Sequence, residues 1–385
     1  MSVITKLGIG RMINARGTAS AIGTSALSAG VQEAMCEAAS AFISMDQMQE
    51  KAGAFIAEVT RTEGAVVTPG AAAGITLAIG ACIVGSNRYA ARQLPNTLGL
   101  KNEVIIQRGH RNDYDQAALL AGAAFVEVGY IFKTEAFELE AAINDRTAAV
   151  LFVDHMRGAQ AGMLRLPEVV RISHAKGVPV VVDAATKLPP YENLWEIPAT
   201  GADLVIFSGG KAIQGPGASG FVCGRKDLIA AVQKMVAPNW GIGRPMKIGK
   251  EEVAGLVAAL DEYIQKDHAA VYQTWENRVE KVLRRVSDIP GYKVERMHPD
   301  ECSRPIPRAR ITALTHPEPV ALEIIQGMKE GNPAIAVAEY LYDLGVVMID
   351  PTCLKDGEEE VVADRLFECM QKAMLHRIER GEGVR

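Results

Sequence analysis

The sequence predicts an α/β protein with a mainly parallel sheet in a large domain, followed by a smaller α+β domain. Two observations predict this architecture. Between about residues 60 and 235, short β-branched runs alternate with longer alanine-rich segments, which is the pattern of βαβ units. After residue 239 the alternation stops, and a long amphipathic segment begins that a parallel sheet would not need.

Most of the predicted strands are continuous apolar runs, as strands buried on both faces should be. They lie at 65–69, 103–107, 124–129, 148–154, 179–185, 203–210 and 220–225. Between them, segments such as 166–177 place apolar residues at helical spacing and end in a glycine suited to the left-handed cap position. The apolar stretch 70–85 is interrupted by glycines, so we expect a buried helix there and no membrane span.

The C-terminal part of the chain predicts a second domain. Residues 250–289 carry apolar side chains on one helical face, which indicates a long connecting helix with a break near His268. Strand-like pieces at 308–314 and 345–350 and a helix near 333–344 complete a small α+β lobe. We therefore expect an N-terminal segment of residues 1–45, a large domain of 46–248, and a connecting helix with a small domain over 249–385.

Composition and charge narrow the class of protein. Of the 385 residues, 41 are Lys or Arg and 46 are Asp or Glu, so the net charge of −5 argues against a nucleic-acid partner. The start of the chain lacks the apolar core of a signal peptide. Six scattered cysteines, with no CxxC and no His at metal-ligand spacing, predict reduced thiols in the cytoplasm, no disulfide and no metal. A small molecule is the expected partner.

One glycine-rich motif matches a nucleotide-binding pattern in its spacing but not in its structural context. Residues 215–220, GPGASG, match G-x-G-x-x-G, but Pro216 removes an amide donor and the segment leads into a strand instead of a helix. A phosphate-binding GxxxxGK[ST] is also absent, because Lys211 is followed by Ala212. The motif therefore does not predict a dinucleotide site.

Asp183 and Lys211 are the two residues that most strongly indicate a ligand site. Each lies just past the end of a predicted buried strand. Parallel α/β sheets place ligands at the carboxyl ends of their strands. Alone, such an Asp is often a helix N-cap and such a Lys is often solvated. Together, the two residues suit pyridoxal phosphate. The lysine follows the small residues Ser208 to Gly210, which leave room for a planar cofactor, and the acid lies one strand away. That cofactor forms an imine with a lysine and pairs its ring nitrogen with a carboxylate.

At these residues the chain resembles the fold-type I pyridoxal-phosphate enzymes. More narrowly, it is similar to the family of bacterial selenocysteine synthase and D-glucosaminate-6-phosphate ammonia-lyase. The resemblance covers nearly the whole chain, and its further marks are MINARGTASAIGTSALS (12–28), TPGAAAGITLAIGAC (68–82), QRGHRNDYDQA (107–117), GRPMKIGKEE (243–252) and VMIDPTCL (347–354). It implies that Lys211 carries pyridoxal 5'-phosphate, and that the N-terminal segment contributes to the active site of at least a homodimer.

A phosphate cradle has both a physical and a family basis. Gly70, Ala71 and Ala72 open the buried helix with minimal side chains, so its unpaired amides and the positive end of its dipole can approach a phosphate. Close packing of an alanine helix explains the same residues without a ligand. The resemblance favours the cradle, with the Ser208 hydroxyl as a further donor.

The resemblance also assigns the two faces of the cofactor ring. His110 follows a predicted strand and is expected over the ring, although a surface loop histidine is the plain alternative. Ala185 is expected to pack under the other face. His155 and His174 are interpreted as structural.

The substrate-binding candidates are cations. Arg16, Arg244 and Lys247 lie in segments that match the family's substrate side, while Arg308 and Arg310 lie where fold-type I enzymes commonly hold a substrate carboxylate. Arginine suits bidentate binding of a carboxylate, and lysine suits a phosphate as a point charge. Surface arginines are common, so each of these could equally be solvated.

The resemblance implies a lyase. Selenocysteine synthase itself is disfavoured, because its tRNA-binding region would precede Met12 and because the acidic chain offers no surface for RNA phosphates. The expected reaction removes water and then ammonia from a 2-amino-2-deoxy sugar acid phosphate such as D-glucosaminate 6-phosphate, with Lys211, Asp183 and His110 as catalytic residues. The alternatives are an amino-acid racemase, an aldol-type lyase, and a pyridoxal-phosphate-binding protein without turnover.

Overall fold

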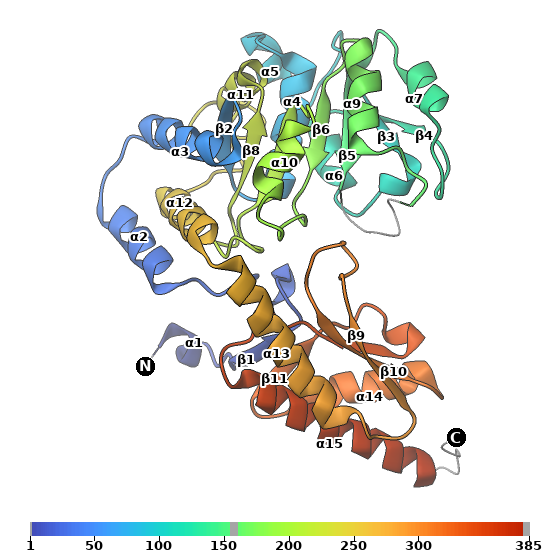
Figure 1. Cartoon of the computed structure of the whole chain (residues 1–385). Helices are drawn as coiled ribbons and strands as arrows, with labels where there is room; N and C mark the ends of the chain where they lie inside the picture. Colours follow the sequence, from blue (N-terminus) through green and yellow to red (C-terminus); the bar gives the residue numbers. More distant parts are fainter. Residues whose placement is uncertain (1, 155–160, 380–385) are drawn as a thin grey trace. The chain divides into compact units, whose positions relative to one another are not determined.

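The computed structural model describes residues 2–154 and 161–379, and the chain divides into two compact units (Figure 1). The large unit comprises Leu27–Gln265 and the short segment Glu301–Arg304. The small unit comprises Met1–Ala26, Lys266–Asp300 and Pro305–Arg385. Each unit has its own hydrophobic core, so each is described by itself.

A seven-stranded sheet, formed by described residues, is the centre of the large unit. Its strands, in spatial order, are β2 (Gly64–Thr68), β8 (Gly220–Gly224), β7 (Leu204–Ser208), β6 (Val180–Asp183), β5 (Thr147–Val153), β3 (Glu103–Gln107) and β4 (Ala124–Val128). Strand β8 runs antiparallel to both of its neighbours, and the pairs from β7 to β4 are parallel. The carboxyl ends of the parallel strands therefore meet at one edge.

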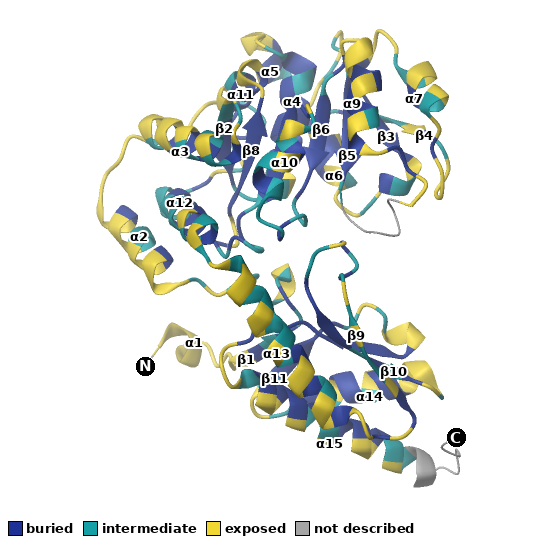
Figure 2. Cartoon of the chain, in the orientation of Figure 1, coloured by how far each residue is buried: buried dark blue, intermediate teal, exposed yellow. Residues whose placement is uncertain are grey.

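The strands are buried on both faces because their apolar runs supply two cores at once. In β6, Val180 and Val182 enter one core cluster and Val181 enters the other. In β7, Phe207 and Ile206 divide in the same way. Figure 2 shows the result as dark strands between helices whose outer faces are exposed. A sheet covered on both faces is held rigidly, which suits it to carry a site at its edge.

Helices cover the sheet. They are α2 (Ala29–Ser40), α3 (Met45–Thr60), α4 (Ala71–Val84), α5 (Arg88–Gln93), α6 (Asp115–Leu119), α7 (Ala136–Ala142), α9 (Leu166–Ala175), α10 (Asn193–Ala199), α11 (Lys226–Gln233) and α12 (Lys250–Gln265), with a short 3-10 helix η2 at Arg108–His110.

Helix α12 holds α2 at both ends. Glu262 accepts a hydrogen bond from the N-cap Ser28, and Lys250 donates to the last carbonyl groups of α2. These charges complement the dipole of α2.

The small unit consists of two small sheets and their helices. The antiparallel sheet orders β12 (Val346–Ile349), β10 (Arg308–Ala313) and β9 (Tyr292–Met297), and β1 (Met12–Ala15) pairs in parallel with β11 (Ala334–Val337). The helices are α1 (Val3–Lys6), η1 (Ser20–Ile22), α13 (His268–Val286), α14 (Pro317–Glu330), η3 (Tyr342–Leu344) and α15 (Glu358–Glu379). Apolar residues of α13, α14, α15 and the strands form its core.

The structure confirms most of the predicted elements. All seven expected strands of the large domain are present, and 70–85 is the buried helix α4. The connecting helix does break near His268, where Asp267 caps α13 by accepting from the amide of Ala270. Gly177 follows α9 with a φ of +69°, the left-handed conformation expected there.

The predicted helix near 333–344 is wrong. Residues 334–337 form β11, and only Tyr342–Leu344 is helical, as a single 3-10 turn. The alanines favour a helix locally, but pairing with β1, more than 300 residues away in the sequence, decides the outcome.

The observed division of the chain also differs from the expected boundaries. It falls after Gln265, and α12 therefore belongs to the large unit, because Val253, Leu256 and Leu260 enter a core of that unit. The N-terminal 45 residues are shared, since residues up to Ala26 belong to the small unit and α2 to the large one. All six cysteines are free thiols.

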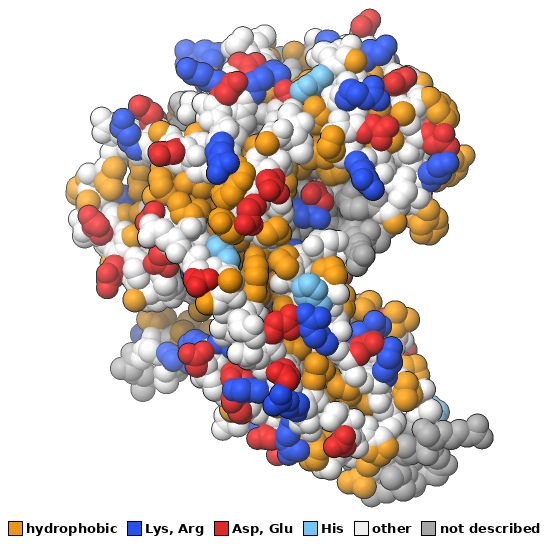
Figure 3. Space-filling view, in the orientation of Figure 1, with side chains coloured by type: hydrophobic (Ala, Val, Ile, Leu, Met, Phe, Trp, Pro, Cys, Tyr) orange, Lys and Arg blue, Asp and Glu red, His pale blue; other side chains and the backbone are white. Residues whose placement is uncertain are grey.

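Two observations concern a membrane or a highly charged partner. Among the described residues, no helix is both long and apolar enough to cross a membrane. On the face drawn in Figure 3, acidic and basic side chains are interspersed.

Candidate functional site

The carboxyl edge of the large sheet gathers the residues that the sequence singled out. Ser208 pairs in register with Gly220, and Gly220 pairs with Thr68, so the ends of β7 and β2 lie in one row. Asp183, the last residue of β6, pairs with Ile206 of β7. Lys211 follows β7 in a loop closed by a 2.9 Å bond from the Gln214 amide to the Lys211 carbonyl. The topology therefore brings these residues to one edge.

Lys211 and Asp183 interact electrostatically across this edge. Burial lowers the pKa of the Lys211 amine, the Asp183 carboxylate opposes that shift, and the Arg304 guanidinium lowers the pKa further. Asp183 is only 7% exposed, and its Oδ1 accepts a 3.0 Å hydrogen bond from the Ala185 amide. A lysine with a lowered pKa is more often neutral, which is the form that attacks a carbonyl and accepts a proton.

The start of α4 approaches the sheet unusually closely. Gly70, the N-cap, has a φ of +99°, and the first helical residues are Ala71 and Ala72. A Cβ placed on Gly220 would lie 2.9 Å from the Gly70 carbonyl carbon and 3.0 Å from the Ala71 nitrogen, so only glycine fits at that point of β8. The start of α4 is thereby brought close to Gly220, which pairs in register with Ser208. Its first amides and small side chains suit the approach of an anion.

His110 is a buried residue of the large unit, not a surface one. It is 2% exposed, its Nδ1 accepts a 3.3 Å hydrogen bond from the Val153 amide, and its ring meets Phe152 edge-on at 4.7 Å. With Nδ1 accepting, the neutral ring carries its proton on Nε2. His174 lies in α9 and bonds Asp203 at 2.8 Å, in keeping with a structural role. His155 lies outside the described residues.

Three of the expected substrate-binding cations belong to the small unit, where carboxylates engage them. Arg16 pairs with Glu339 at 3.1 Å, and Arg310 lies 3.7 Å from Glu295 on the neighbouring strand. Arg308 is 3% exposed and pairs with Asp350 at 2.9 Å. The structure thus places Arg308 within a buried ionic cluster of the small unit.

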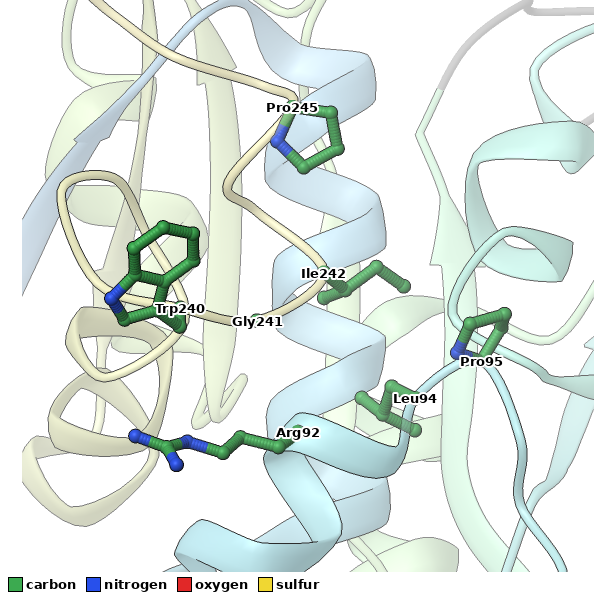
Figure 4. A pocket seen from close by; sticks show the side chains of 7 residues that line it. All are labelled: Arg92, Leu94, Pro95, Trp240, Gly241, Ile242 and Pro245. Carbon is green, nitrogen blue, oxygen red and sulfur yellow. The ribbon is translucent and has the colours of Figure 1, made fainter.

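Arg244 and Lys247 lie in the large unit between α11 and α12. Lys247 is exposed, and the Arg244 guanidinium lies 5.7 Å from the centre of the Trp240 ring. Beside Trp240 is a cavity of about 660 Å³, drawn in Figure 4; its lining residues are Arg92, Leu94, Pro95, Trp240, Gly241, Ile242 and Pro245. None of these is a residue of the Lys211 edge, so the cavity is distinct from that edge.

Sequence reasoning missed three charged residues of the large unit that lie outside its strands. Lys187 pairs with Asp154 at 2.7 Å and donates a 3.2 Å hydrogen bond to the carbonyl of Cys302. Arg304 acts on the Lys211 amine, as described above. Asp154 and Lys187 each follow the end of a parallel strand, a signal like the one that found Asp183. Arg304 lies in a loop between β9 and β10 and carries no such signal.

Comparisons with known proteins agree with this fold. The model of the L-seryl-tRNA selenium transferase family matches residues 12–274. D-glucosaminate-6-phosphate ammonia lyase of Salmonella typhimurium (strain 14028s / SGSC 2262) is 35% identical over 97% of this chain and 99% of its own. A 5'-C-glycyluridine monooxygenase-decarboxylase of a Streptomyces species is 36% identical over 94% and 91%.

Solved structures give the same result. A structure of D-glucosaminate-6-phosphate ammonia-lyase superposes with a TM-score of 0.83 and 34% identity, over 97% of this chain and 99% of that one. A serine palmitoyltransferase from S. paucimobilis with bound PLP shares the fold, with a TM-score of 0.61 and 14% identity over 94% and 88%.

The mainly parallel sheet and its structural neighbours define a fold-type I enzyme, the class of pyridoxal-phosphate-dependent transferases and lyases. Within that class, the chain belongs to the L-seryl-tRNA selenium transferase family and is a homologue of an ammonia lyase.

Proposed function

We propose that this protein is a pyridoxal-phosphate-dependent ammonia-lyase. Its substrate would be a 2-amino-2-deoxy sugar acid 6-phosphate such as D-glucosaminate 6-phosphate, and its products 2-keto-3-deoxygluconate 6-phosphate and ammonia. The observation that carries this proposal is the similarity to D-glucosaminate-6-phosphate ammonia lyase along the full length of both chains. The charge arrangement at Lys211 and Asp183 supports the cofactor class.

The residues at the sheet edge fit pyridoxal phosphate. The start of α4, which glycine at position 220 allows to pack closely against β8, suits the phosphate, with the amides after Gly70 and the Ser208 hydroxyl as donors. Buried Asp183 suits the ring nitrogen, and Ala185 and His110 suit its two faces. When bound, the cofactor supplies an electron sink for the carbon that loses its proton.

The chain's own groups then account for the proton movements. Lys211, the pKa of whose amine is lowered by burial, takes the α-proton of the substrate. The C3 hydroxyl leaves as water once it receives a proton from His110 Nε2–H or from protonated Lys211. Hydrolysis of the released enamine consumes one water and yields the keto acid and ammonia. Water lost equals water consumed, so the reaction needs no oxidant or reductant.

A second candidate follows from the relative that is 36% identical, the 5'-C-glycyluridine monooxygenase-decarboxylase. A reaction of that kind would consume oxygen and release carbon dioxide, whereas the lyase reaction would do neither. The lyase is favoured because its similarity covers 99% of the relative, compared with 91% for the monooxygenase-decarboxylase.

The deciding experiment supplies amino sugar acids, with and without a 6-phosphate, to the protein with and without oxygen. We expect anaerobic release of ammonia and a keto acid, with a specificity constant about 10- to 100-fold higher for the phosphorylated form, since a charge-assisted contact contributes roughly 1.5–3 kcal/mol. Equal rates would reject the phosphate preference, and dependence on oxygen would favour the second candidate. Exchange of an amino acid's α-proton without ammonia release would replace the lyase by a racemase.

Lys247 is the proposed contact for that phosphate, because it is an exposed point charge in the matching segment. Lys247→Ala should raise KM for the phosphorylated substrate at least tenfold and leave KM for the unphosphorylated one unchanged. Arg244 and Arg16 are proposed to bind the rest of the substrate, within at least a homodimer, which sedimentation of the holoenzyme would test.

A further inference from the structure

A short segment far along the chain is anchored to the carboxyl edge of the large sheet. Among the described residues that follow Gln265, 266–379, only Glu301–Arg304 belongs to the large unit. Its anchor is Lys187, whose Nζ donates to the Cys302 carbonyl at 3.2 Å and lies 2.7 Å from Oδ1 of Asp154. The side chains of Lys187 and Asp154 are 13% and 22% exposed, so solvent screens this pair only in part.

The anchor is built into the same edge that carries Asp183. Asp154 follows β5, and its amide donates to the carbonyl of Asp183 at 3.0 Å. Lys187 closes the turn after β6, because its amide donates to the Ala184 carbonyl at 3.0 Å and its own carbonyl accepts from Asn193 at 2.7 Å. Asp154 is therefore tied to the end of β6, and Lys187 is tied to the turn that follows β6 and to α10.

Arg304 lies two residues beyond the anchored carbonyl. Its guanidinium is near enough to Lys211 to lower the pKa of that amine, and the other groups that act on the amine are Asp183 and the Cys302 thiol. The Lys187 charge is not among these groups, so Lys187 can affect Lys211 chiefly through the segment that it holds. A cation fixed near the reacting amine is also placed to attract an anion carried by an incoming amine substrate.

We propose that the Lys187–Asp154 ion pair is a positioning device that fixes the Glu301–Arg304 segment at the sheet edge, and that Arg304, held there, binds the carboxylate of the amino acid substrate. The carboxylate role rests on the proposed function, because it requires an α-amino acid as substrate. The sequence analysis had predicted that Arg308 or Arg310 binds the substrate carboxylate. In the structure those two arginines pair with carboxylates of the small unit, and the proposal gives this role to Arg304 instead.

The positioning claim is tested on the apoprotein, without cofactor or substrate. The rate at which an acylating reagent modifies Lys211 is followed against pH by mass spectrometry. Arg304→Gln should shift the midpoint up by about one pH unit, because it removes a like charge that lowers the pKa of the Lys211 amine. Lys187→Met should give at least half of that shift, and the double variant no more than Arg304→Gln alone.

Two controls separate positioning from general loss of structure. Lys187→Arg keeps the ion pair and should restore the wild-type midpoint, while Lys133→Met, which removes an exposed lysine paired with Glu135, should leave it unchanged. The positioning claim is overturned if Lys187→Met leaves the midpoint unchanged, or if the shifts of Lys187→Met and Arg304→Gln add.

The carboxylate claim uses two small amines, serine and serinol, which differ only in the carboxylate. Their dissociation constants are measured on the holoenzyme from the absorbance of the cofactor. Arg304→Gln and Lys187→Met should each weaken serine at least tenfold relative to serinol. Equal losses for both amines overturn the carboxylate role. Since neither probe is the proposed sugar acid, failure of the lyase assay would leave both results interpretable.

Discussion

Replacing Arg308 tests whether this residue stabilises the small unit or binds substrate. Its guanidinium lies 2.9 Å from Asp350 and 3.5 Å from Asp300, and it donates a 2.7 Å hydrogen bond to the Tyr340 hydroxyl. The three charged residues are 3%, 2% and 1% exposed. Arg308→Met would leave two carboxylates buried without their cation, which costs roughly 3–5 kcal/mol of unfolding free energy.

Hydrogen exchange of the amides in β10 and β12 measures this cost within the small unit. A loss of that size corresponds to opening that is about 150- to 5000-fold more frequent. Arg310→Met is the matched control on the same strand, because its side chain is 35% exposed and 3.7 Å from Glu295, so it should cost less than about 1 kcal/mol. Adding Asp350→Asn to Arg308→Met should recover part of the loss. Equal protection in the two single variants would refute the reasoning, and a raised KM without loss of protection would return Arg308 to the substrate site.

Three further predictions concern the sheet edge. Borohydride reduction of the holoenzyme should attach the pyridoxyl group to Lys211, and a label on another lysine would reject that assignment. Asp183→Asn should keep the cofactor and lower kcat about a hundredfold or more, since the ring nitrogen loses its counter-charge; near-native turnover would contradict this role. Burial lowers the pKa of Lys211 in the folded apoprotein, so the unfolded chain binds more protons and stability should rise between the folded and the unfolded pKa of this lysine. Lys211→Met should therefore stabilise the apoprotein in denaturant titrations at pH 7 and lose that advantage near pH 11, and a variant destabilised at pH 7 would show that burial does not dominate.

The strands of the large unit could be predicted because their signal is local. Continuous β-branched runs such as Val180–Asp183 can only be buried on both faces, and helices of matching length lie between them. Strand β11 shows the limit. Its sequence suits a helix as well as a strand, and the partner that decides between them, Met12–Ala15, is remote.

The same distinction applies to the site. Asp183 and Lys211 can be predicted as site residues because each follows a strand. Asp154 and Lys187 also follow strands, so the same sequence feature would predict them. Arg308 and Arg304 could not be told apart from the sequence. Which arginine is buried against Asp350 and which lies near Lys211 depends on tertiary packing.

The two relatives of nearly equal identity carry names of unlike reactions, a lyase and a monooxygenase-decarboxylase. A shared fold therefore positions a cofactor without fixing what is done with it. The proposed cofactor-binding residues, Asp183 and Ser208, would have the same role in either reaction, so they would not determine which reaction occurs. The Glu301–Arg304 segment is different, because it lies outside the strands of the sheet and Lys187, paired with Asp154, donates a hydrogen bond to its Cys302 carbonyl. Differences in reaction should therefore be sought first in that segment and in its anchor at Lys187.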